Sequence, residues 1–535
     1  MVCKSKNVLK LILLILICVY FMLILCIGLS YHWGYLSTLE DIGTFDQAVW
    51  GTLHGDFFLN THNDFNVPIN YLGFHFRPIL LIFLPFYAIL PRVEWMILTQ
   101  SLALALSAWP IFLLARQVSK SDLAALFWAV AYMVHPFVIN VSPWAFRPES
   151  LAVPFIAAAL LSIEKSNLHL LLLSCLFIVL CKEHFGIMVV GLGILWGLRN
   201  RKWKPAILII LGGTAYSAMV LGIIMPALSP LGKHVMLSEG FGQLSRYSWL
   251  GLSLKEVFQS LFFHPLSVAK TVVLKMGGAS YLLLLLIFFL GLPLAAPEFL
   301  LPGLADLMAN MLSANPMPRN IFAYHSVSLI PVFTVAAVYG TERICRWIKK
   351  FTAKEWAVFA AIACLIGGYF LAPLPLPGSR NMWAPTLFLN YPDPVLPTVR
   401  SVVGNNSSVS AQANIGAHFS QREEIYQYPN KVTQVDVIVL RLESPTNNIN
   451  KLSSHSINNR KYLTGMLDAH LQMDRDDYLA SIESLLSNSE YGVSLWQDPW
   501  LVFSKNSKNI DFREQIKQKL SQLKKDWKIC VEKKY

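Results

Sequence analysis

The sequence contains little charge for its length. Only 14% of its 535 residues are Asp, Glu, Lys or Arg, whereas soluble globular chains carry about 25%. The shortage is uneven, because about 11% of residues 1–372 are charged against about 21% of residues 373–535. Apolar runs such as LILLILICVYFMLILCIGL need lipid around them. The composition excludes an ordinary soluble protein and predicts a transmembrane domain, residues 1–372, followed by a polar domain, residues 373–535.

Motifs for metal, disulfide and nucleotide sites are also missing. The eight cysteines form no CxxC pair, and neither HExxH nor a Gly-rich phosphate loop occurs. A zinc knuckle, a disulfide framework and an ATP-driven pump are therefore not supported. His62, Asp64, His75 and His325 would be the residues available for a divalent metal, but their spacing is not that of a metal site. We expect no cofactor.

Eleven apolar segments have the length of membrane spans, or of helices broken inside protein. They are residues 8–30, 94–115, 121–139, 149–164, 168–181, 184–198, 205–226, 279–293, 297–312, 324–341 and 355–372. The net charge of +12 comes largely from short loops between them, which indicates orientation in a membrane and not nucleic-acid binding. The long loop 31–93 contains only Arg77 and Arg92 as basic residues.

The positive-inside rule then places the N-terminus in the cytoplasm and the loops 31–93 and 227–278 outside. An odd number of spans also places the C-terminal domain outside. Within loop 31–93, the short segment 77–91 has proline near both ends and is predicted to be an interfacial or re-entrant helix.

The C-terminal domain follows a proline-rich linker, PLPLPGSR. Short strands are predicted at 408–412, 424–428, 435–442 and 500–504, and helical periodicity covers 463–487 and 510–528. The predicted fold is thus mainly α, a polytopic transmembrane helix bundle, with a small extracytoplasmic α/β domain at its C-terminus.

An acidic motif, EDIGTFDQAVW, directly follows the first apolar segment. It places Glu40, Asp41, Asp46 and Gln47 at the outer membrane surface, and Gly43 permits a turn or a close approach to a ligand. A carboxylate there can accept a proton from a hydroxyl nucleophile, as a general base does. Acidic residues also stabilise a helix N-terminus, so catalysis and capping remain alternatives.

Two outward turns carry arginine before proline. GFHFRP contains His75 and Arg77, and WAFRPES contains Arg147 and Glu149. The planar guanidinium suits a phosphate or pyrophosphate, because it hydrogen-bonds two oxygens at once. An arginine that only reaches toward lipid headgroups is the alternative.

A third turn, CKEHFG, places Lys182, Glu183 and His184 between two short apolar segments. Breaks between short helices are where membrane proteins bind polar ligands, although an ion pair that joins the two helices would look the same. Asp306 within 297–312 and His325 at the start of 324–341 are further ionisable groups near membrane depth.

Six segments occur in a recognisable order: DIGTFDQAVWGTLHG, FHFRPILLIFLPFYAILP, FRPESLAVPF, CKEHFG, AYHSVSLIPVF and NIGAHFSQREEIYQYP. In this order they resemble the domain of unknown function 2079 family of bacterial and archaeal multispanning proteins. That family is similar in layout to the C-type membrane glycosyltransferases, which take a sugar from a polyprenyl-phosphate carrier on the outer face.

The layout resemblance implies roles for individual residues. Asp41 would be the general base, Asp46 a second catalytic carboxylate, and Arg77 and Lys182 contacts to the donor phosphate. The other residues implied in substrate binding are Glu40, Gln47, His75, Arg147, Glu149, Glu183 and His325.

We therefore expect a glycosyltransferase of the bacterial inner membrane. Its partners would be a lipid-linked sugar donor, membrane lipid and a glycan, lipid or protein acceptor, with no nucleic acid. One alternative is a lipid or polysaccharide transporter, which would need two alternating gates, commonly built from repeats that are not visible here. Another is a non-catalytic membrane anchor for the outer domain, which has no use for so many outward polar turns.

Overall fold

The computed structural model describes residues 2–63, 65–237, 242–377, 379, 390–443, 470–507 and 512–531. The chain forms two compact units, and each is composed of several segments. The helical unit comprises Met1–Gly28, Tyr71–Ile82 and Glu94–Trp383, and the sheet unit comprises Leu29–Asn70, Phe83–Val93 and Ala384–Tyr535. Most of the predicted outward loop 31–93 therefore shares a unit with the C-terminal segment.

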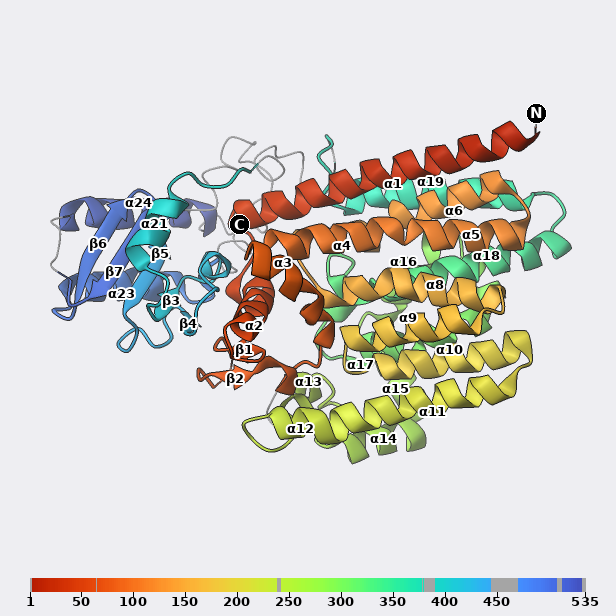
Figure 1. Cartoon of the computed structure of the whole chain (residues 1–535), viewed down its shortest axis with the longest axis horizontal. Helices are drawn as coiled ribbons and strands as arrows, with labels where there is room; N and C mark the ends of the chain where they lie inside the picture. The colour runs from red at the N-terminus through yellow and green to blue at the C-terminus, as the bar shows by residue number, and fades with distance from the viewer. Residues whose placement is uncertain are drawn as a thin grey trace. The chain divides into compact units, whose positions relative to one another are not determined.

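Helices of very different lengths build the helical unit (Figure 1). In chain order its elements are α1 (Val2–Trp33, whose last five residues belong to the sheet unit), η2 (Tyr71–Gly73), η3 (Pro78–Phe83), α4 (Glu94–Leu106), α5 (Ala108–Ser119), α6 (Asp122–Met133), α7 (Pro136–Ile139), η4 (Ser142–Trp144), η5 (Pro148–Ala152), α8 (Val153–Glu164), α9 (Leu168–Cys181), α10 (Phe185–Asn200), α11 (Trp203–Met219), η6 (Val220–Ile224), α12 (Met225–Leu228), η7 (Val235–Leu237), α13 (Gly242–Ser245), α14 (Leu254–Phe263), α15 (Pro265–Leu274), α16 (Gly278–Ile287), η8 (Leu292–Ala295), η9 (Pro297–Gly303), α17 (Leu304–Leu312), η10 (Met317–Arg319), η11 (Tyr324–Ser326), α18 (Leu329–Trp347) and α19 (Ala353–Leu371).

Four helices in the described ranges are long and apolar enough to cross a membrane. They are Val8–Trp33, Glu94–Ser119, Trp203–Leu228 and Ala353–Leu371, and the number rises to six if each of two bent helix pairs is one span. Each of the eleven predicted segments contains helix, but several of these helices are short, such as the 14-residue α9. The count of eleven spans is not confirmed, and the interfacial position of 77–91, which is helical over Pro78–Ile89, stays a prediction.

Apolar side chains face outward on three of the long helices. Val19 of α1, Leu208 of α11 and Phe370 of α19 are each more than half exposed. Such surfaces are typical of helices surrounded by lipid, because water would make the same exposure costly. The helical unit thus has the surface of a membrane domain.

Close contacts between helices depend on glycine. A Cβ on Gly213 of α11 would lie 2.5 Å from the backbone oxygen of Gly186 in α10, and one on Gly340 of α18 would lie 1.9 Å from the backbone oxygen of Leu292. Small residues at such crossings let backbones approach, as they do in membrane helix bundles. Packing around α10 matters for the site, because α10 begins just after the Lys182–Glu183–His184 turn.

The sheet unit combines a small five-stranded sheet with helices from both ends of the chain. Its elements are η1 (Leu39–Gly43), α2 (Thr44–Leu53), β1 (Leu59–Asn60), β2 (Ile69–Asn70), α3 (Leu84–Ile89), α21 (Leu396–Val403), β3 (Val409–Ala411), η12 (Gly416–His418), β4 (Ile425–Gln427), β5 (Val437–Arg441), α23 (Arg475–Ser487), β6 (Tyr491–Gln497), β7 (Trp500–Lys505) and α24 (Arg513–Val531). The strand order is β4-β3-β5-β7-β6, parallel from β4 to β5 and antiparallel from β5 to β6.

The central strand β5 buries both of its faces. Ile438 and Leu440 join one apolar core with α23 and α24, whereas Val437 and Val439 join another with α21. This alternation follows from the two-residue period of a strand. Leu39 of η1 lies in the second core, so the segment after α1 belongs structurally to the sheet.

The predicted α/β domain is confirmed in its main elements. The four predicted strands correspond to β3, β4, β5 and β7, and the two predicted helices to α23 and α24. Strand β6 was not predicted. The first part of the predicted helix 463–487, up to residue 469, lies outside the described residues.

Candidate functional site

Three consecutive ionisable residues, Lys182, Glu183 and His184, lie at the break between α9 and α10. Lys182 directly follows Cys181, the last residue of α9, and has an extended backbone. Their partners come from three other segments: Glu149 of η5 for Lys182 (Nζ to Oε1, 3.2 Å), His75 for Glu183 (Nδ1 to Oε1, 3.3 Å) and Asp306 of α17 for His184 (Nε2 to Oδ1, 2.8 Å). The break therefore joins distant parts of the helical unit through an ion pair and two hydrogen bonds.

Two cations meet on one carboxylate oxygen at the centre of this cluster. Arg77 approaches Glu149 Oε1 with its Nη2 at 2.7 Å, and Lys182 Nζ reaches the same atom. Arg77 also donates from Nη1 to the Tyr71 hydroxyl at 3.0 Å. Arg77 is 4% exposed and Glu149 3%. Charges so deeply buried are stable only when they are paired, and here both cations contact Glu149.

Some acceptor capacity in this cluster is unused. Glu149 Oε2 and Glu183 Oε2 are buried and have no hydrogen-bond partner within the described part of the chain. A buried polar atom left unpaired costs about 1–3 kcal/mol. These two oxygens can still accept hydrogen bonds, from a hydroxyl group or from water.

Arg147 lies between aromatic rings beside this cluster. Its guanidinium carbon lies 4.9 Å from the ring centre of Trp144 and 4.1 Å from that of Tyr324. Tyr324 stacks on His325 with 4.2 Å between ring centres. Ala145, two residues before Arg147, has a φ of 57° and a ψ of −66°, and the Phe146 N–H donates to the Trp144 carbonyl oxygen, so a γ-turn precedes Arg147.

The surroundings set the protonation of Lys182 and His75. Burial alone would lower the pKa of Lys182, but the carboxylates of Glu149, Asp306 and Glu183 outweigh it and raise the pKa. Burial and the charge of Arg77 lower the pKa of His75 more than Glu183 raises it. At neutral pH the cluster therefore holds an ammonium at Lys182 and a neutral imidazole at His75.

Asp46, in the acidic motif of the sheet unit, is fully used in hydrogen bonds. Its Oδ1 accepts from the Tyr87 hydroxyl at 2.7 Å and from Gln421 Nε2 at 3.0 Å, and its Oδ2 accepts from the Ser420 hydroxyl at 2.6 Å. Asp46 is 1% exposed. Burial raises the pKa of Asp46, although these hydrogen bonds partly offset it. Asp46 joins α2 to α3 and to the segment after η12.

The other members of the acidic motif differ in exposure. Gln47 is buried, donates to the Thr61 hydroxyl at 2.8 Å and accepts from the Thr61 backbone N–H at 3.0 Å. Glu40 is exposed and Asp41 half-buried, both in the π-helical turn η1. Asp41 therefore combines a carboxylate with access from solvent, which Asp46 lacks.

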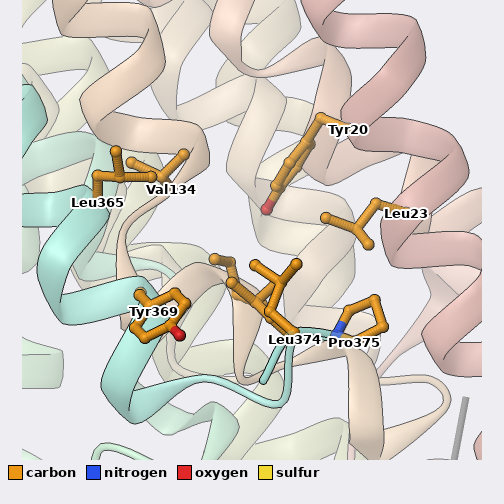
Figure 2. A pocket seen from close by; sticks show the side chains of 10 residues that line it. Tyr20, Leu23, Val134, Leu365, Tyr369, Leu374 and Pro375 are labelled. Carbon is orange, nitrogen blue, oxygen red and sulfur yellow. The ribbon is translucent and has the colours of Figure 1, made fainter. Parts of the chain in front are cut away.

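A separate apolar cavity of about 260 Å³ lies within the helical unit. Figure 2 shows Tyr20 of α1 directing its hydroxyl into it, with Leu365 and Tyr369 of α19 on another side. The Tyr20 hydroxyl has no hydrogen-bond partner among the residues that the structure describes. No residue predicted for the site lines this cavity.

The sequence profile of the family described as "Predicted membrane protein (DUF2079)" matches residues 31–502. The chain belongs to this family. Curated protein sequences give no match. Among solved structures, the crystal structure of ArnT from Cupriavidus metallidurans bound to undecaprenyl phosphate is similar, with 11% identity and a TM-score of 0.48. The similarity covers 92% of this chain and 97% of that chain.

The predicted site residues divide between the two units. His75, Arg77, Glu149, Lys182 and Glu183 form the ion-paired cluster of the helical unit. Arg147 and His325 lie beside it and interact with it electrostatically. Glu40, Asp41, Asp46 and Gln47 belong to the sheet unit. The roles of all these residues stay predictions.

Several members of the cluster were not among the predicted site residues. Tyr71 supports Arg77, Tyr324 stacks on Arg147, and Asp306 binds both His184 and the Ser328 hydroxyl, the latter at 2.6 Å. A carboxylate inside the apolar segment 297–312 was the available signal for Asp306. Nothing in the local sequence distinguishes the two tyrosines from ordinary packing residues.

A metal site is not visible among the hypothesised ligands. The described residues contain no group of three His, Cys, Asp or Glu side chains placed to hold a metal ion. Asp64, one of the four hypothesised ligands, lies outside the described residues.

Proposed function

We propose that this protein is a membrane glycosyltransferase that moves a sugar from a polyprenyl-phosphate carrier to an acceptor on the extracytoplasmic face. The observation that carries the proposal is the convergence of Arg77 and Lys182 on one buried oxygen of Glu149. Two buried cations that share one anionic oxygen have the charge and geometry to hold a phosphate oxygen. A phosphate site in a lipid-facing helical domain suits a lipid-linked phosphate.

The proposed reaction needs a base and positive charge on the leaving group. The acceptor hydroxyl oxygen forms a bond to the anomeric carbon while the bond from that carbon to the phosphate oxygen breaks. The phosphate oxygen keeps the electron pair, and polyprenyl phosphate leaves with its charge stabilised by Arg77 and Lys182. The base takes the proton of the acceptor hydroxyl.

We assign the base to Asp41. Asp46 has three donors on its two oxygens and is closed off from solvent, which supports a structural role. Asp41 is half-exposed and belongs to the same motif, so it retains the role that the family layout implies. A general base must reach the proton it removes, and the buried carboxylate of Asp46, which already accepts three hydrogen bonds, is closed off from solvent.

A transporter would use the same cations without breaking a bond, and a membrane anchor would use neither. Purified protein in lipid nanodiscs, given a panel of polyprenyl-phosphate sugars and candidate acceptors, separates these functions. We expect free polyprenyl phosphate to appear only with the transferase, and to depend on Arg77. Arg92→Ala is the matched control, because Arg92 is an exposed arginine of the same predicted loop. Lipid movement without release of polyprenyl phosphate would overturn the proposal in favour of a transporter.

A further inference from the structure

The cations proposed to hold phosphate already hold an anion of the protein itself. Glu149 Oε1 lies 2.7 Å from Arg77 Nη2 and 3.2 Å from Lys182 Nζ. This is the arrangement in which two cations bind one phosphate oxygen. Arg77 and Glu149 are almost completely buried, so a phosphate has no space between them as they stand.

We propose that Glu149 occupies the phosphate position when the donor is absent and must leave it before the donor phosphate binds. This inference rests on the proposed function and deepens it, because it makes Glu149 a competing anion and not a contact to substrate. In this exchange of Glu149 for the donor phosphate, both cations keep an anionic partner at every stage. A buried cation without a close counterion would cost several kcal/mol, and Glu149 is the carboxylate that contacts both cations in this structure.

The unpaired oxygen of Glu149 is consistent with this exchange. Oε1 has two cationic partners, whereas Oε2 is buried with no hydrogen-bond partner within the described ranges. A carboxylate held permanently as a structural link would be expected to satisfy both oxygens, as Asp46 does. Glu149 is therefore held through Oε1, which accepts the 2.7 Å hydrogen bond from Arg77 and contacts Lys182, while Oε2 adds no hydrogen bond from the described residues.

Glu149 positions and regulates phosphate binding in this scheme. When an internal group occupies a binding site, the apparent Kd of the ligand equals its intrinsic Kd divided by the fraction of time that the site is open. Removal of the carboxylate should then strengthen phosphate binding. If Glu149 instead only orients the cations, its removal should weaken phosphate binding, so the direction of the change decides between the two.

The test uses a short-chain polyprenyl monophosphate, without sugar or acceptor, and the full-length protein in nanodiscs. We expect Glu149→Gln to bind this probe at least ~10-fold more tightly than the unmodified protein, if the site is closed at least nine-tenths of the time. In phosphate-free buffer this variant should melt at a lower temperature, and inorganic phosphate should restore its Tm more than it raises that of the unmodified protein. Glu149→Asp, which keeps the charge on a shorter side chain, should lie between them.

Glu298→Gln is the matched control, because Glu298 is a carboxylate paired with Arg343 outside the cluster. Its affinity for the probe should equal that of the unmodified protein. Equal or weaker binding by Glu149→Gln would overturn the exchange. If the exchange is observed but no sugar is released from any donor, the proposed transferase function fails while the exchange stands. If Arg77→Ala leaves probe binding unchanged, the phosphate site itself is wrong.

Discussion

Asp46 and Gln47 in the acidic motif of the sheet unit and the ion-paired cluster of the helical unit are buried and polar, yet they differ in how completely their groups are paired. Asp46 receives three hydrogen bonds and Gln47 both donates and accepts. In the other cluster, Glu149 and Glu183 each retain a buried oxygen without a partner in the described part of the chain. Complete pairing is typical of a structural link, and incomplete pairing indicates a place for a ligand.

The largest effect is expected at Arg77, because it supports both structure and phosphate binding. Arg77→Ala removes the closer of the two cations that contact the buried Glu149, and loss of one partner from such a pair costs about 3–5 kcal/mol. Thermal denaturation should show this loss. Probe binding should fall by at least ~10²-fold, since a charged hydrogen bond is lost.

Arg77→Lys sharpens this test. Lysine keeps the charge but cannot contact Glu149 and Tyr71 together as the guanidinium does. We expect intermediate stability and intermediate probe affinity. Wild-type affinity in Arg77→Ala would show that the cluster is a structural link like Asp46.

Asp41 comes next, with an effect on turnover alone. Asp41→Asn should lower kcat by about 10²-fold or more, which is typical for a lost general base. Its Tm and its affinity for the polyprenyl monophosphate should not change, because Asp41 is half-exposed and the amide has the same shape. Unchanged turnover in folded Asp41→Asn would refute the assignment of the base.

Asp46 should show the opposite pattern. In Asp46→Asn one acceptor oxygen becomes an NH₂ group that faces hydroxyl or amide donors, so we expect a loss of about 1–3 kcal/mol in unfolding free energy. The kcat of the protein that remains folded should stay near normal. Loss of turnover in Asp46→Asn, with normal turnover in Asp41→Asn, would transfer the base to Asp46.

The sequence predicted the apolar helical segments and four of five main-sheet strands, because apolar periodicity is a local property, but it did not predict helices α14 and α15 within the loop 227–278. It did not predict that segments 29–70 and 83–93 share a unit with the C-terminal strands, because that grouping depends on contacts such as Asp46 with Ser420, 374 residues apart. The same limit applies to the cluster, where His75 and Glu183 are 108 residues apart. The motifs identified charged residues, and the fold decided which were paired.

Tyr20 provides the smallest and most discriminating test of the comparison. Its hydroxyl is also buried without a partner in the described residues, but it faces an apolar cavity with no charged lining (Figure 2). If an unpaired group indicates a ligand only in a polar cluster, Tyr20→Phe should leave turnover and probe binding unchanged. Removing the hydroxyl should also raise the unfolding free energy by up to about 1 kcal/mol, because its desolvation is no longer a cost. Differential scanning fluorimetry in nanodiscs measures the change in stability. A clear loss of stability would mean that the Tyr20 hydroxyl does have a hydrogen-bond partner. An atom without a partner in the structure would then be a poor guide to function.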